Sequence, residues 1–96
     1  MERYFEWDDK KAAINYRKHG VRFEEAARAF DDPFAISEQD RIENGEQRWQ
    51  TMGMTGGYLL LLVAHTVRSE NEGIEIVRII SARRADRKER RRYEHG

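Results

Sequence analysis

In Arg78-Ile-Ile-Ser-Ala-Arg-Arg-Ala-Asp-Arg-Lys-Glu-Arg-Arg-Arg-Tyr93, an apolar strand pattern changes into a strongly basic helical pattern. Residues 83 to 92 contain six arginines and one lysine against two acids, although the whole chain has no formal net charge. A final helix is therefore predicted to follow directly on a strand, docked through one thin stripe. The residues of that stripe are Ala82, Ala85, Glu89 and Tyr93.

Upstream of this stretch, apolar and polar residues alternate with the period of a strand. Short turns separate the alternating segments, and consecutive strands with short turns are typical of an antiparallel meander. The polar residues 40–46, around Asn44-Gly45, are expected to form a loop. The predicted strands are Phe34–Glu38, Arg48–Met54, Tyr58–Val67 and Ile74–Ser81.

Two helices are predicted before the strands. The first spans Asp9–His19, with Asp8 as its N-cap and Gly20 as the residue that ends it. The second has an apolar stripe at helical spacing and is stopped by Asp31-Asp32-Pro33. Residues 3–7 suit either a short edge strand or an aromatic plug under the first helix.

These elements predict one α+β domain over residues 1–96. It has two N-terminal helices, a four-stranded antiparallel sheet and a C-terminal helix, with the helices on one face of the sheet. A chain of 96 residues is of the size of a single domain.

The amino-acid composition limits the kinds of site that the chain can form. The chain has no cysteine and three scattered histidines, so we expect neither a metal site nor a cofactor. No segment has the pattern of a signal peptide or a membrane span, so a cytoplasmic location is expected. Residues 1–47 carry 8 basic and 12 acidic side chains, whereas residues 48–96 carry 10 and 6. Residues 48–96, the basic half, are therefore expected to bind a polyanion.

Two polar side chains fall in apolar strand rows. His65 shares a row with leucines and valines, and its simplest interpretation is a hydrogen-bonded histidine near a strand end. Arg78 shares a row with isoleucines. Its guanidinium is permanently charged, so it must reach a carboxylate, a phosphate or water.

The excess of arginine in the last helix favours nucleic-acid contact over a face that is only solvated, because arginine grips phosphate bidentately. We expect Arg48, Arg68, Arg87 and Arg91 to bind RNA. Trp49 or Tyr58 could stack a base, although core positions suit both better.

RNA cleavage needs no metal, because the ribose 2′-OH is an internal nucleophile. It does need a proton carrier and cations that stabilise the phosphorane. His65 is the expected proton carrier at neutral pH. Arg78, Arg83 and Arg84, placed at the junction of strand and helix, are expected to converge on one phosphate that faces His65.

Many short blocks, in order along nearly the whole chain, resemble the BrnT toxins of type II toxin–antitoxin systems. The blocks are Phe5-Glu-Trp-Asp8, Lys11 with Ala12, Arg17-Lys-His-Gly-Val21, Phe23-Glu-Glu-Ala26, Phe30-Asp-Asp-Pro33, Glu46-Gln-Arg-Trp49, His65-Thr66, Arg78-Ile-Ile-Ser-Ala-Arg-Arg84 and Glu89-Arg-Arg-Arg-Tyr93.

The resemblance implies a fold similar to the RelE ribonucleases and a metal-independent endoribonuclease that inhibits translation. It also implies neutralisation by a BrnA-type antitoxin with a ribbon-helix-helix part, so that operator DNA is bound only through the antitoxin. A non-catalytic module that binds nucleic acid or the antitoxin in an autoregulatory complex is the alternative. A third hypothesis is that the arginines only solvate the surface and pair with the acidic half.

Overall fold

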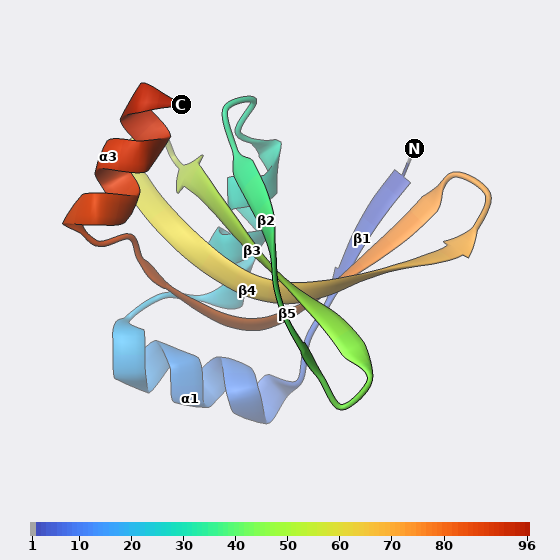
Figure 1. Cartoon of the computed structure of the whole chain (residues 1–96). Coiled ribbons are helices and arrows are strands. Elements are labelled where there is room, and N and C mark those ends of the chain that lie inside the picture. The colour runs from blue at the N-terminus through green and yellow to red at the C-terminus, as the bar shows by residue number, and fades with distance from the viewer. Residues whose placement is uncertain (1) are drawn as a thin grey trace.

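The computed structural model describes residues 2–96, which form five strands, three α-helices and one 3-10 helix (Figure 1). Among these residues, no helix is long and apolar enough to cross a membrane. In chain order the elements are β1 (Glu2–Glu6), α1 (Asp9–His19), α2 (Phe23–Arg28), the 3-10 helix η1 (Ala29–Asp31), β2 (Ile36–Glu43), β3 (Glu46–Thr55), β4 (Leu59–Asn71), β5 (Ile74–Arg84) and α3 (Arg87–His95).

The strands form one mixed sheet in the order β1-β5-β4-β3-β2. β2 to β5 form the predicted antiparallel meander, but β1 adds a fifth strand, parallel to β5, with Phe5 opposite Val77. The prediction of a four-stranded, wholly antiparallel sheet is therefore wrong in detail, and residues 3–6 lie in an edge strand that ends at Glu6. Pairing between the two ends of the chain is a non-local contact, which a local sequence pattern does not reveal.

The helices cover both faces of the sheet, so the prediction that they lie on one face is wrong. Figure 1 shows α1 and α3 on opposite sides of the strands. In β4, Leu61 and Val63 join the core under α1 and α2, whereas Leu60 and Leu62 lie with Met52 under α3. Neighbouring residues of a strand point to opposite faces. We call the two sides the α1 face and the α3 face.

The larger core lies on the α1 face. There η1 approaches β3 so closely that a Cβ atom on Gly53 would lie 2.2 Å from the carbonyl oxygen of Ala29. Glycine at this position thus allows the helical segment to rest on the sheet. The buried members of this core are Val21, Phe23, Ala26, Ala29, Leu61, Val63, Val77, Ile79 and Ala82.

Several strands are longer than the sequence pattern predicts. β2 runs on to Glu43 through most of the predicted loop, with a shift in register between Gln39 and Ile42. β5 runs on to Arg84, and α3 starts only after its N-cap, Asp86. The Asp86 carboxylate accepts a hydrogen bond of 2.8 Å from the Glu89 backbone N–H, which fixes this later helix start.

Asn15 completes the edge of β5. Pairing with β1 ends at Arg78, and beyond it the Asn15 carboxamide takes the place of a neighbouring strand. Its Nδ2 donates to the carbonyl oxygens of Ala82 at 2.9 Å and Val21 at 3.0 Å, and its Oδ1 accepts from the Ala82 N–H at 3.0 Å. Because Asn15 is buried, one side chain anchors α1 to β5 through three hydrogen bonds.

We predict that Asn15→Ala lowers the free energy of unfolding by about 3 kcal/mol, because buried backbone groups of Ala82 and Val21 lose their partners. Urea denaturation measures the difference. The control is Ile14→Ala on the same helix, where the side chain is 56% exposed and the change should be close to zero. Equal stability of the two variants would contradict the anchoring role.

Candidate functional site

Arg78 lies on the α3 face, near the hairpin ends of the sheet. Its Nη2 donates to Glu46 Oε1 at 2.5 Å, which joins β5 to the first residue of β3 across β4. Beside it, Arg68 of β4 binds both carboxylate oxygens of Glu6 at 2.9 and 3.1 Å and also reaches Glu70 at 3.2 Å. The bond from Arg68 holds the pKa of Glu6 below its usual range. Each guanidinium is thus paired with at least one carboxylate.

Arg48 of β3 lies on the same face, since its neighbour Trp49 is on the opposite face with His65. It pairs with Glu43 at 3.0 Å, and its side chain is only 15% exposed. Its Nε is buried and has no hydrogen-bond partner among the described residues. We define the arginine cluster as Arg48, Arg68 and Arg78 with their partners Glu43, Glu6 and Glu46.

Arg83 lies on the α3 face at the other end of β5. It makes two hydrogen bonds, of 2.8 and 2.9 Å, to the Glu89 carboxylate, and this pairing lowers the pKa of Glu89. At about 3.3 Å per residue, Arg78 and Arg83 are roughly 16 Å apart along the strand. The two arginines therefore suit different phosphates of one strand rather than a single phosphate.

α3 is fixed over the sheet by polar contacts and by Ala85 and Tyr93, whereas Ala82 of the predicted docking stripe lies in β5 and joins the core of the α1 face. Arg92 pairs with Glu38 at 3.2 Å, and the Tyr93 hydroxyl donates to the Asp32 carboxylate. That hydrogen bond raises the pKa of Tyr93 to about 12.

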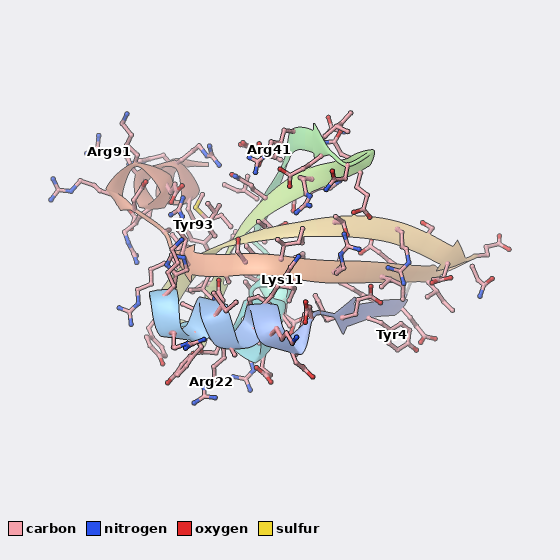
Figure 2. The ribbon with its side chains drawn as sticks, turned by 90° about the horizontal axis from the view of Figure 1, so that it is seen from below. Tyr4, Lys11, Arg22, Arg41, Arg91 and Tyr93 are labelled. Atoms are coloured by element: carbon pink, nitrogen blue, oxygen red, sulfur yellow. The ribbon has the colours of Figure 1, made fainter. Side chains whose placement is uncertain are left out.

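The outward side of α3 presents a second group of cations. Four of its side chains are exposed and form no ion pair within residues 2–96. Figure 2 shows Arg91 directed away from the sheet. Phosphates can approach these side chains without displacing a carboxylate. They are Arg87, Lys88, Arg90 and Arg91.

His65 lies on the α1 face and is 2% exposed. Its Nε2 is 2.7 Å from Thr51 Oγ1, which is in turn 2.7 Å from Ser37 Oγ, and the Phe30 ring contacts it edge-on at 4.9 Å. Burial lowers the pKa of His65 to about 4, so the ring is neutral at pH 7. The interpretation as a hydrogen-bonded strand histidine fits this environment.

The structure does not bring His65, Arg78, Arg83 and Arg84 together, and their predicted convergence on one phosphate is wrong. Arg78 and Arg83 are on the α3 face, whereas His65 is on the α1 face. Arg83 and Arg84 end a strand instead of starting a helix, so their side chains point to opposite faces. A shift in register between residues 64 and 65, where β4 pairs with β5, was not visible in the sequence.

Glu46 is the residue that sequence reasoning missed. The sequence pattern places Glu46 at the end of a polar loop, yet it is the first residue of β3 and contacts Arg78. The only sequence signal for Glu46 is that it begins Glu46-Gln-Arg-Trp49, one of the short blocks that resemble the BrnT toxins. Together, Arg78 and Glu46 place a cation that can bind a phosphate oxygen beside a carboxylate that can accept a proton. No group of three or more potential metal-ligating side chains was found among the described residues.

A family model described as "Ribonuclease toxin, BrnT, of type II toxin-antitoxin system" matches residues 7–89. Among solved structures, the crystal structure of the Brucella abortus ribonuclease toxin BrnT is similar, with a TM-score of 0.60 and 18% sequence identity. The alignment covers 91% of this chain and 100% of that one, so the likeness is one of the whole fold. No curated protein sequence matches.

We predict that the stability of the protein falls as the pH is lowered from 6.5 to 4. The unfolded chain protonates His65 near its ordinary pKa of 6.5, whereas the folded protein does so only near 4, so protons favour unfolding in this window. The loss from His65 is about 3 kcal/mol. Urea denaturation at a series of pH values measures it, and His65→Gln should remove this part of the slope. An unchanged slope in that variant would contradict the assignment.

Proposed function

The chain belongs to the BrnT family of ribonuclease toxins of type II toxin–antitoxin systems, and we propose that it cleaves RNA without a metal ion, through attack of the ribose 2′-OH. The observation that carries this proposal is the Arg78–Glu46 pair on the α3 face. A guanidinium stabilises negative charge on a phosphorane, and a carboxylate beside it accepts the proton of the nucleophile.

The proposed reaction starts when a phosphate of the RNA binds Arg78 and displaces Glu46 from it. Glu46 then accepts the proton of the 2′-OH while the 2′ oxygen forms a bond to phosphorus. The bond from phosphorus to the 5′ oxygen breaks, and this oxygen takes up a proton from water as it leaves, since the pair is open to solvent. The products carry a 2′,3′-cyclic phosphate and a 5′-hydroxyl, and cleavage of messages in this way inhibits translation.

In this proposal the other arginines of the α3 face contact the RNA on either side of the cleaved bond. In this proposal Arg83 binds a phosphate a few nucleotides from the cleaved bond, because it lies at the far end of β5. Arg48 and Arg68 support the cluster around Arg78, and Arg87 and Arg91 hold the RNA backbone. His65 has no part in proton transfer in this proposal, and Arg84 does not bind the cleaved phosphate, because neither faces the cluster.

The family implies a protein antitoxin as partner and RNA as substrate. We propose a BrnA-type antitoxin with a ribbon-helix-helix part, through which alone the complex would reach operator DNA. A cytoplasmic location follows from this proposal, because the messages and the antitoxin are found there.

We predict that Glu46→Gln and Arg78→Ala each lower the rate of RNA cleavage by about 10²-fold to 10⁴-fold, the range for loss of a proton acceptor or a charge-stabilising group. Cleavage of an end-labelled single-stranded RNA in the presence of EDTA measures this, and analysis of the product ends identifies the cyclic phosphate. Arg22→Ala is the control, because Arg22 is exposed and stacks on Tyr16. Full activity of both site variants would overturn the assignment.

We predict that the double variant Arg87→Gln and Arg91→Gln binds RNA with a smaller salt dependence, while the catalytic rate of bound RNA stays the same. Loss of two phosphate contacts should reduce the slope of log K against log salt by about 1.4 on a single strand. The matched control exchanges Arg17 and Lys18, which are exposed on α1. An unchanged slope would show that the α3 cations only solvate the helix.

The same assay tests the alternative function. If the wild-type chain binds RNA with this salt dependence but leaves it intact, the protein is a non-catalytic binding module of an autoregulatory complex.

A further inference from the structure

A pocket of about 220 Å³ opens on the α1 face, beyond the end of η1. It lies on the opposite side of the sheet from the arginine cluster, so the proposed cleavage reaction does not use it. The buried His65 forms part of its lining, and all five strands contribute at least one side chain. The pocket is therefore a feature of the tertiary fold rather than of one loop.

Apolar and aromatic side chains form much of the pocket lining. Phe30 and Trp49 supply rings, and Val67 and Val77 supply aliphatic surface. The Phe30 ring makes edge-on contacts with Phe5 at 5.2 Å and His65 at 4.9 Å, and the Arg3 guanidinium lies over it, 5.6 Å from its centroid, so Trp49 is the ring left for a ligand. Rigid aromatic surfaces suit a planar heteroaromatic ligand, because stacking on an aromatic ring stabilises a nucleobase.

An ion pair lies among the polar groups of the pocket. Arg3 Nε donates to Glu75 Oε1 at 2.7 Å, and the side chains of Arg3 and Glu75 are 43% and 22% exposed. Among the described residues, Glu75 Oε2 accepts no hydrogen bond. The pair therefore presents a donor and an acceptor side by side, with Ser37 as a further hydroxyl in the lining.

From these groups we infer that the pocket binds a guanine base, with its ring against Trp49 and its edge on Arg3 and Glu75. Guanine carries an acceptor, O6, next to two donors, N1–H and the 2-amino group. Arg3 donates to O6, and the Glu75 carboxylate accepts from N1–H and the 2-amino group. Bases bound outside a duplex are commonly read in this way, by stacking and by hydrogen bonds to the Watson–Crick edge.

The other bases do not match this edge. Adenine and cytosine have no ring N–H donor on their Watson–Crick edge, so a ring nitrogen acceptor would face the Glu75 carboxylate. Uracil offers one donor flanked by two acceptors, which leaves a carbonyl oxygen against the carboxylate. A half-buried carboxylate that faces a lone pair instead of a donor gains no hydrogen bond and is repelled, which disfavours such a ligand. The pocket should therefore prefer guanine over each other base by at least 10-fold.

The guanine can come from a free nucleotide or from an RNA strand, and the chemistry of the pocket is the same for both. Because the pocket and the arginine cluster lie on opposite faces, a guanine taken from RNA would be remote from the cleaved bond. The inference does not depend on ribonuclease activity, since binding is measured without cleavage.

The test is a fluorescence titration of the whole chain with each of the four nucleoside 5′-monophosphates. We expect GMP to quench Trp49 and to bind at least 10-fold more tightly than AMP, CMP or UMP. Inosine monophosphate lacks the 2-amino group and should bind several-fold more weakly than GMP. A 2′-O-methyl oligoadenylate with one central guanine distinguishes the source: tighter binding than GMP indicates RNA, and weaker binding indicates the free nucleotide.

Three variants complete the experiment. Glu75→Gln should abolish the preference for GMP, because the amide cannot accept both hydrogen bonds. Trp7→Phe, which lies outside the pocket lining and packs on Phe23, should keep the response, whereas Trp49→Phe should lose it. Equal binding of all four nucleotides, equal binding of GMP and inosine monophosphate, or an unaltered preference in Glu75→Gln would overturn the inference. The inosine comparison needs no variant and so does not depend on folding.

Discussion

β5 is the strand on which the rest of the structure depends. It pairs with β4 along one edge, with β1 along half of the other edge, and with the Asn15 carboxamide beyond β1. Its side chains alternate between two covered faces, so Val77 and Ile79 enter the core while Arg78 and Arg83 do not. One strand therefore organises the core and carries two arginines of the candidate site.

The basic residues of the α3 face fall into two electrostatic classes. Those on the sheet are tied to carboxylates, as Arg78 is to Glu46 and Arg83 to Glu89, whereas the outer cations of α3 are not. RNA would first meet the unpaired charges, which attract a polyanion at long range. It would then compete with the carboxylates on the sheet. A displaced carboxylate remains next to the phosphate, which is where a proton acceptor is needed.

Because the two faces of the sheet are separate, His65 has other neighbours than the arginine cluster has. His65 was the natural proton carrier from its chemistry, but the sheet lies between it and the arginine cluster. Its neighbours are Thr51, Phe30 and the lining of the α1-face pocket. The chemistry of the side chain alone thus favours His65 for proton transfer, whereas the face of the sheet on which each residue lies is the reason that we propose Glu46.

By itself, the sequence determined the family, the α+β class, the limits of α1 and the antiparallel meander from β2 to β5, because these depend on local periodicity, caps, turns and short motifs. Only the tertiary structure decided that β1 joins β5, that α3 lies on the second face and that Arg78 meets Glu46. These features depend on strand register and on contacts between residues distant in the chain. A bulge, or a strand that continues further than predicted, changes the face of the sheet to which a side chain points. Neither leaves a clear pattern in the local sequence.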